Sequence, residues 1–301
     1  MGANSGSLAV KVRSGAVVNP DGGFDQDIIA EMVEAGLSAL SPELDAIALV
    51  RNVLGNAGSI GIKVNTIGGP GMSTRVELVN ALTAFLKSAG YPVKKQIIWD
   101  RHDGELADVG FGVRSRGDGP YCFGTDHVGV GYSQDLVSNG QIGGLLSRIL
   151  VDYSEVIINV PVLKDHGVAG ITGALKNHYG SIHNPNKYHG GNCNPYIADL
   201  NALEQIKSRQ CLIVMDALKV QFHGGPAYQK RWAADCGMLL FGTDPVAIDT
   251  IGYEIIEGLR SRAGLESIKG SRREPIYLNT AAVYGLGTND TKGIKIKEVA
   301  I

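Results

Sequence analysis

The chain has 301 residues, of which 44% are hydrophobic and 19% charged, and its formal net charge is -2. These are ordinary values for a globular protein that is long enough to bury a substantial core. The balanced charge and the lack of nucleic-acid-binding motifs argue against a nucleic acid partner, and no apolar run approaches the roughly 20 residues of a transmembrane helix.

Two helices and a strand are predicted at the start of the chain. Apolar side chains recur at helical spacing over residues 24–39, and a second helix is expected over Pro42–Leu54. The β-branched run Ile60–Val64 follows and ends at Asn65, which is typical of a buried strand.

A βαβ unit is predicted next. The glycine-rich loop Gly68–Gly71 precedes Thr74 and Glu77, whose spacing is that of a capping box at the start of a helix. Gly90 is expected to end this helix, and Lys95–Trp99 is expected to be the following strand. Strand, helix and strand in this order are typical of a parallel sheet.

Residues 101–140 are polar and rich in glycine, and we expect them to form an inserted subdomain with a hairpin near Val128–Tyr132. A helix is predicted over Gln141–Val151, because its apolar residues recur at helical spacing. The apolar run Glu155–Val160 is then predicted as a strand.

The last part of the chain continues the alternation. A helix is predicted over Tyr196–Lys207, and strands over Cys211–Met215 and Gly237–Phe241. Asp244 is predicted to cap a helix that has Pro245 in its first turn. Together these elements predict a single α/β domain over residues 8–301, with a mostly parallel sheet, flanking helices and long glycine-rich polar loops at the carboxyl edge of the sheet.

Polar residues follow the predicted strands. In open α/β sheets, ligands bind at the edge where the carboxyl ends of the strands lie. The residues in such positions are Asn65, Asp100, Lys164, Asp216 and Asp244.

The segment from Pro161 to His189 is the richest in chemically active side chains. It contains the lysines Lys164, Lys176 and Lys187 and four of the seven histidines, His166, His178, His183 and His189. Lysines close to glycines can hold a carboxylate or a phosphate, and a histidine beside a lysine can act as a base near neutral pH. Histidines and Asp216 are also suitable metal ligands, although their spacing matches no named metal motif.

The four cysteines Cys122, Cys193, Cys211 and Cys236 form no CxxC motif, so we expect free thiols and no iron–sulfur cluster. The segment Met1–Ser7 does not have the pattern of a signal peptide. We therefore expect a soluble protein that is either cytoplasmic or exported with its signal removed.

Several motifs resemble the family called domain of unknown function 362. The resemblance spans roughly residues 55–260 and rests on Gly61–Asn65, Asn159–His166, Thr172–Gly180, His189, Asp199-Leu200, Asp216, His223–Pro226 and Gly242–Asp249. Many members of this largely uncharacterised family carry a ferredoxin-like cysteine segment and others carry an export signal, but this chain shows neither. The lysine, histidine and Gly-Gly-Pro positions do match the family, so the resemblance implies that the site at these positions is shared.

The leading hypothesis is an enzyme that acts on a small anionic molecule, a carboxylate or a phosphate. Its catalytic groups would be Lys164, His166 and His189. The ligand would be bound by Lys63, Lys176, Asn177, Gly224 and Gly225.

Two other hypotheses remain open. The protein could be an accessory protein that binds a divalent metal or a cofactor without turnover, with Asp216, His223 and His189 as metal ligands. It could also be a redox enzyme that works with a separate electron carrier. Against the last reading, no GxGxxG motif follows a predicted strand.

Overall fold

The computed structural model describes residues 6–301, so most of the segment Met1–Ser7 lies outside the described residues. The fold is α/β, built on a ten-stranded, mostly parallel mixed sheet with the strand order β12-β1-β11-β10-β7-β2-β3-β4, and with β8 and β9 continuing beside β10. The strands of this sheet are β1 (Ser7–Arg13), β2 (Ile60–Lys63), β3 (Gln96–Asp100), β4 (Tyr121–Gly124), β7 (Val156–Asn159), β8 (Val162–His166), β9 (Gly170–Thr172), β10 (Gln210–Gln221), β11 (Ala233–Gly242) and β12 (Ile294–Ala300). The predicted fold class is therefore confirmed.

The strands at the centre of the sheet are short and almost entirely buried. Every residue of β2 and β3 is buried, and in β7 only Val156 is partly exposed. Strands covered on both faces are apolar on both faces, and this explains the uninterrupted apolar runs of the sequence. Consecutive side chains still alternate: Ile157 packs into one apolar core and Ile158 into the other.

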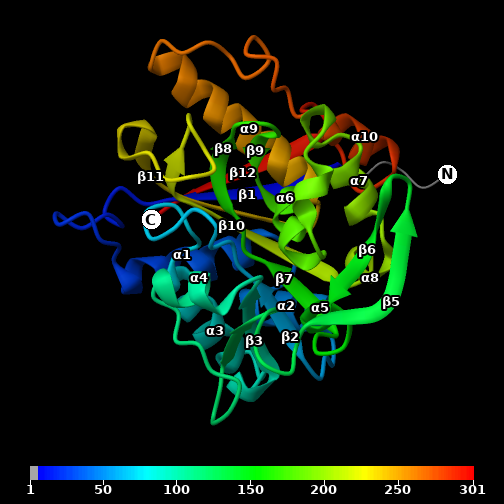
Figure 1. Ribbon diagram of the computed structural model, residues 1–301. Helices are drawn as coiled ribbons and strands as arrows, with labels where there is room; N and C mark the ends of the chain where they lie inside the picture. The colour runs from blue at the N-terminus through cyan, green and yellow to red at the C-terminus, as the bar shows by residue number, and fades with distance from the viewer. Residues whose placement is uncertain (1–5) are drawn as a thin grey trace.

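Helices cover both faces of the sheet. The helices are α1 (Gln26–Ala39), α2 (Ala46–Leu54), α3 (Val76–Ser88), α4 (Asp103–Asp108), α5 (Arg148–Val151), α6 (Ala174–Asn177), α7 (Tyr196–Asn201), α8 (Glu204–Lys207), α9 (Pro245–Arg262) and α10 (Tyr277–Val283). Residues of α1, α2 and α3 share one core, and residues of α6, α7, α9 and α10 share the other. Figure 1 shows this layering, with the blue helix α1 and the orange helix α9 on opposite sides of β1. None of the helices within residues 6–301 is both long and apolar enough to cross a bilayer.

The predicted helix over Gln141–Val151 is wrong. The segment forms β6 (Ile142–Ser147) and then only the short helix α5, and β6 pairs with β5 (Tyr132–Asn139) in a separate two-stranded sheet. The apolar residues do recur at helical spacing, but Gly143 and Gly144 are poor helix formers, and both pair with β5. The hairpin is thus centred at the Gly140-Gln141 turn rather than near Val128–Tyr132.

Other boundaries also differ from the prediction. The segment Tyr196–Lys207 is divided into α7 and α8 rather than forming one helix. Thr74 does not cap α3, because its hydroxyl accepts a hydrogen bond from Asn65 N and donates one to Val160 O. Asp244 does cap α9, by accepting from Ala247 N at 2.8 Å, as predicted.

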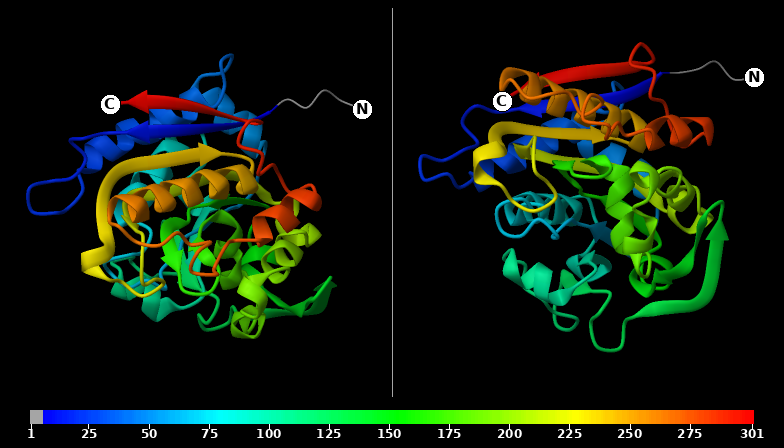
Figure 2. Two further views of the ribbon diagram at one scale, coloured as in Figure 1. Left: turned by 90° about the horizontal axis from the view of Figure 1, so that it is seen from above. Right: turned by 45° about the horizontal axis from the view of Figure 1, so that its top comes forward.

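The direction of the strands decides which polar residues share an edge. Strands β2, β3, β7 and β10 run parallel, so their carboxyl ends lie at the same edge of the sheet. Asn65, Asp100 and Val160 lie at this edge, at the ends of β2, β3 and β7 respectively. Strand β11 runs antiparallel to β10, so Asp244 lies at the opposite edge. Asp216 lies within β10 rather than at its end, since this strand continues to Gln221. Figure 2 shows the blue strand β1 and the red strand β12 side by side, at the sheet margin formed by the two ends of the chain.

Two helical glycines provide a test of the packing between α1 and the sheet. A Cβ added at Gly36 of α1 would lie 2.2 Å from the ring of Phe241, whereas at Gly258 of α9 it would meet only the end of Arg262, at 3.7 Å. We expect Gly36→Ala to lower the free energy of unfolding by about 1–3 kcal/mol through overpacking. Gly258→Ala is expected to raise it by roughly 0.4–1 kcal/mol. Urea denaturation measures both, and equal effects of the two substitutions would contradict the close packing of α1.

Candidate functional site

A cavity of about 230 Å³ opens at the carboxyl edge of the parallel strands. Its wall is formed by the loops after β2 and β3, by β8 and β9, and by the segment from α6 to His189. Its lining residues include Asn65, Asp100, Arg101, Glu105, His166, Thr172, Lys176, Asn177, Tyr179, His189 and Pro226. The structure therefore brings four of the predicted site residues into one cavity: His166, Lys176, Asn177 and His189.

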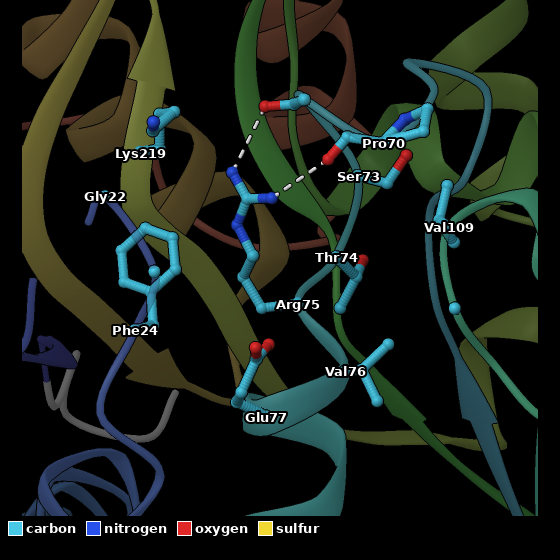
Figure 3. Close-up of a pocket in the computed structure, with 13 residues that line it drawn as sticks. Gly22, Phe24, Pro70, Ser73, Thr74, Arg75, Val76, Glu77, Val109 and Lys219 are labelled. Carbon is cyan, nitrogen blue, oxygen red and sulfur yellow. Dashed lines mark hydrogen bonds between the residues drawn. The ribbon is translucent and has the colours of Figure 1, made fainter. Parts of the chain in front are cut away.

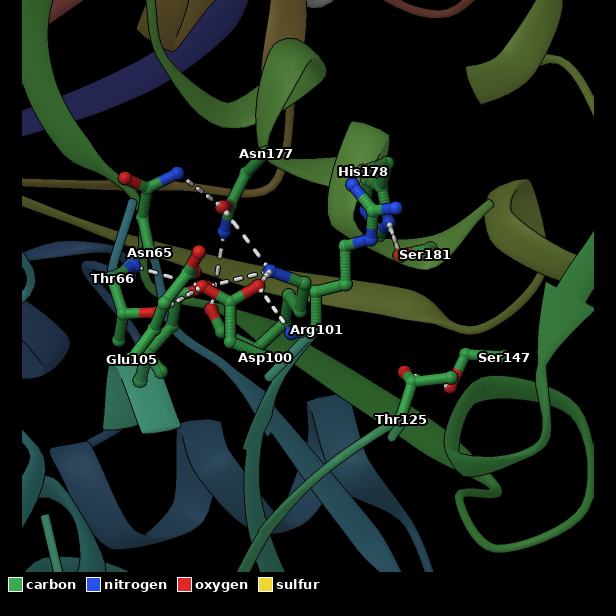
Figure 4. Close-up of polar contacts among 12 residues, drawn as sticks. Asn65, Thr66, Asp100, Arg101, Glu105, Thr125, Ser147, Asn177, His178 and Ser181 are labelled. Atoms are coloured by element: carbon green, nitrogen blue, oxygen red, sulfur yellow. Dashed lines mark hydrogen bonds and ion pairs between the residues drawn. The ribbon is translucent and has the colours of Figure 1, made fainter. Parts of the chain in front are cut away.

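A buried ion pair joins the ends of β2 and β3 below this cavity. Lys63 Nζ lies 2.7 Å from Asp100 Oδ1, and Lys63 is fully buried. Asp100 accepts further hydrogen bonds from Arg101 N at 2.9 Å and from the Thr66 amide and hydroxyl, each at 2.8 Å (Figure 4). Lys63 was predicted to bind the ligand, but its charge is compensated by Asp100, and it does not line the cavity.

Two asparagines connect this ion pair to the cavity wall. Asn177 Oδ1 accepts from Asn65 Nδ2 at 3.1 Å and from Lys63 Nζ at 3.4 Å, and Asn177 Nδ2 donates to Asn159 Oδ1 at 2.8 Å (Figure 4). Every polar atom of the Asn177 side chain is therefore used inside the protein. Asn177 was predicted to bind the ligand, but its side chain instead holds Lys63, Asn65 and Asn159 in place.

Lys164 lies behind the wall. It is fully buried, and its Nζ donates to Asn65 Oδ1 at 2.7 Å and to Met72 O at 3.0 Å. Burial lowers the pKa of Lys164 to about 7. It was predicted as a catalytic group, but it does not line the cavity, which it reaches by its hydrogen bond to Asn65.

Lys176 is the most unusual residue of the site. It lies on the short helix α6, whose first amides donate to the buried carboxylate of Asp249. Its side chain is nearly buried, with 7% exposure, and Nζ lies 4.0 Å from the centre of the Tyr179 ring. Nζ donates to His189 Nε2 at 3.3 Å, and no carboxylate within residues 6–301 forms an ion pair with it. Burial lowers the pKa of Lys176 to about 8.

The hydrogen bonds of His189 define its protonation. Its Nδ1 lies 3.2 Å from Pro185 O, which can only accept, so Nδ1 carries a proton. Nε2 then presents its lone pair to Lys176. Burial, followed by the charge of Lys176, lowers the pKa of His189, so the ring is neutral at pH 7.

His166 was predicted as an acid–base group, and the structure gives it a different position. Its Nδ1 accepts from the amides of Val168 and Ala169 at 3.1 and 3.0 Å, and its ring stacks on that of His189 at 5.6 Å. Burial, followed by the charge of Lys176, lowers the pKa of His166 to about 2. The ring is therefore neutral and carries its proton on Nε2, which makes it a hydrogen-bond donor and a poor base.

Arg101 and Glu105 were not predicted as site residues. Both follow β3 and line the cavity. The Nε atom of Arg101 is buried and has no hydrogen-bond partner in the part of the chain that the structure describes. Burial, followed by the charge of Asp100, raises the pKa of Glu105. Asp100 was identified because it lies at the carboxyl end of a predicted strand. Including the residues up to the first turn of the helix that follows this strand would have identified Arg101 and Glu105 as well.

The Gly-Gly-Pro turn supports the cavity from the side of β8. Gly225 N donates to Asp165 Oδ2 at 3.0 Å, and a Cβ at Gly225 would lie 1.8 Å from Asp165 O, so only glycine fits there. Asp165 also receives Arg273 Nη1 at 2.9 Å and lies 3.6 Å from Arg260 Nη1. Pro226 lines the cavity, whereas Gly224 lines a different one.

The three predicted metal ligands lie apart. Asp216 accepts from Arg75 N and Leu218 N, His223 contacts Arg260 and Trp232, and His189 is bonded to Lys176. Between residues 6 and 301, no three His, Cys, Asp or Glu side chains are grouped so that they could hold a metal ion. The structure thus does not assemble the predicted metal site.

A larger cavity of about 500 Å³ lies at the start of α3. Arg75 in its wall donates to the carbonyl oxygens of Pro70 and Gly71, and it packs on the ring of Phe24 (Figure 3). Lys219, also in the wall, forms an ion pair with Asp235 at 3.0 Å. The terminal nitrogens of Arg75 thus have two carbonyl acceptors and Lys219 has a carboxylate. Within residues 6–301, Lys176 has only a neutral histidine as a hydrogen-bond partner, and the buried Nε of Arg101 has none. We therefore place the candidate site in the smaller cavity.

The buried Lys63–Asp100 pair can be tested against an exposed pair of the same type, Lys94–Asp118. We expect Asp100→Asn to lower the free energy of unfolding by about 3–5 kcal/mol, because Lys63 would remain buried without a counter-charge. Asp118→Asn is expected to change it by less than about 1 kcal/mol. Urea denaturation at pH 7 measures both. The double variant Lys63→Met/Asp100→Asn should recover part of the lost free energy of unfolding, because it removes the unpaired charge. A loss below about 1 kcal/mol for Asp100→Asn, or no such recovery in the double variant, would contradict the interaction between Lys63 and Asp100.

Comparison with solved structures gives a distant likeness. A crystal structure of a Thermotoga maritima protein from the Northeast Structural Genomics Consortium matches 80% of this chain at 12% sequence identity, with a TM-score of 0.42. The match spans 60% of that protein's chain. No curated protein matches the chain.

The family comparison covers the residues that build the cavity. The model of the family described as Domain of unknown function (DUF362) matches residues 60–254, from β2 to the middle of α9. This range contains Lys63, Asp100, Lys176 and His189 as well as the Gly-Gly-Pro turn. The chain belongs to the DUF362 family.

Proposed function

We propose that the protein is an enzyme that acts on a small anionic molecule, a carboxylate or a phosphate, bound in the cavity at the carboxyl edge of the sheet. One observation carries the proposal: Lys176 is nearly buried, lines the cavity, and forms no ion pair with a carboxylate of the described residues 6–301. A buried cation is costly unless an opposite charge compensates it. A bound anion provides that charge.

Two more groups are suited to the same anion. The partnerless Nε of Arg101 belongs to a guanidinium that can hold a carboxylate or a phosphate through paired hydrogen bonds. His166 contributes a neutral ring with its proton on Nε2. Since both histidines are neutral, the positive charge of the site comes from Lys176 and Arg101.

The same geometry assigns the acid–base work. Lys176 has a pKa of about 8 and donates to the free lone pair of His189. An ammonium group with a pKa near the working pH can release and recover a proton efficiently. We therefore assign proton transfer to the Lys176–His189 pair rather than to His166.

Replacing Lys176 tests the anion site. We expect Lys176→Met to weaken the binding of small phosphates and carboxylates by about tenfold or more, because a hydrogen bond to a charged group is lost. Lys187→Met is the matched control, since Lys187 is exposed and donates only to Gly143 O. Isothermal titration calorimetry compares the two, and equal affinities would contradict the proposal. Proton and phosphorus NMR of the bound ligand then tests turnover, and binding without new resonances would favour an accessory protein.

The pH dependence of binding follows from the pKa of Lys176. Burial lowers the pKa of Lys176 to about 8, so the charged form that attracts an anion predominates at pH 7, makes up about half at pH 8 and is lost above that pH. We expect the affinity for glutarate, a dianion throughout this range, to be constant from pH 6.5 to 7.5. Above pH 8 it should fall by up to about tenfold per pH unit. Calorimetric titrations should show this fall in wild-type protein and in Lys187→Met but not in Lys176→Met, and a fall that persists in Lys176→Met would exclude Lys176 as its origin.

A further inference from the structure

Glu105 is a hydrogen-bond acceptor in this cavity that the anion site does not use. It lies on α4, in the wall formed by the segment after β3, whereas Lys176 lies on α6. The hydrogen-bond contact of the Glu105 side chain within residues 6–301 is that of Oε2 with Thr66 Oγ1, at 3.4 Å. The two groups thus bring opposite charges to one cavity from separate segments of the chain.

The hydroxyl of Thr66 cannot satisfy Glu105. It has a single proton, and Asp100 Oδ2 accepts it at the shorter distance of 2.8 Å (Figure 4). Asp100 is also held by Lys63 and by the amide of Arg101. Glu105 is partly exposed, and when ionised it therefore accepts no hydrogen bond from a donor within residues 6–301, while Asp100 accepts four.

We infer that the anionic ligand also carries an ammonium group, and that Glu105 binds this group. The inference rests on the proposed function, because the anionic end of the ligand is held by Lys176 and Arg101. An ammonium group supplies the donors that Glu105 lacks. Burial and the charge of Asp100 raise the pKa of Glu105, and a bound cation would offset both effects.

The charges of the cavity narrow the class of ligand. Lys176 and Arg101 contribute two positive charges and Glu105 one negative charge. Two further lining residues have partners of their own: Asp100 pairs with Lys63, and His102 with Asp126. A complementary ligand carries one ammonium group and a net charge near -1. Aminoalkyl phosphates and amino dicarboxylates have this charge, and small members of both classes suit a cavity of about 230 Å³.

The experiment compares ligands that differ only in the ammonium group. The two pairs are 2-aminoethyl phosphate with ethyl phosphate, and glutamate with glutarate. Calorimetry at pH 7 on the full chain should show that the ammonium-bearing member of at least one pair binds wild-type protein about tenfold tighter. In Glu105→Gln the ratio within that pair should fall to about one.

The control is Glu34→Gln, which removes an exposed carboxylate from α1 and should keep the wild-type ratio. Equal affinities within both pairs in wild-type protein would overturn the role of Glu105 and leave the anion site intact. If the wild-type ratio of affinities within a pair persists in Glu105→Gln, the role of Glu105 is likewise overturned and the anion site is left intact. If none of the four compounds binds, or if binding does not depend on Lys176, the proposed function fails and this inference fails with it.

Discussion

The burial of positive charge at the carboxyl edge of the sheet is the constraint on which the site depends. Lys63, Lys164 and Lys176 lie at or near this edge and are all buried. The three ammonium groups have different hydrogen-bond partners. Lys63 donates to a carboxylate, Lys164 to two neutral oxygen atoms, and Lys176 to a neutral histidine. A carboxylate compensates the desolvation of Lys63, whereas burial lowers the pKa values of both Lys164 and Lys176. Of these two lysines, which form no ion pair within residues 6–301, Lys176 is the one that lines the cavity.

The sequence predicted the parallel half of the fold better than the antiparallel half. Strands β2, β3 and β7 and helix α3 were found because buried parallel strands are apolar throughout and their crossover helix has a regular apolar face. The direction of β11 depends on its pairing with β10, which no local pattern encodes. This is why Asp244 was placed at the wrong edge, and why Asp216 was expected at the end of a strand.

The residues that line the cavity were predicted only in part. Lys176 and His189 were identified from the density of donors between Pro161 and His189, and the structure brings them together. The role of His166 could not be predicted, because it depends on two amides that reach Nδ1 only in the folded loop. Arg101 and Glu105 were missed because the segment after β3 has no regular pattern, although it follows a strand end that the sequence identified.

The contacts of Asp165 have a consequence for where the functional unit ends. The family match stops at residue 254, yet Arg260 and Arg273, which hold Asp165, lie beyond it. Arg273 also donates to the carbonyl oxygen of His166, which lines the cavity, at 3.0 Å. A fragment trimmed to the matched range would leave the Asp165 carboxylate without either guanidinium group. The range that the family model matches is thus shorter than the segment that compensates Asp165, and engineered truncations should keep the chain at least through Arg273.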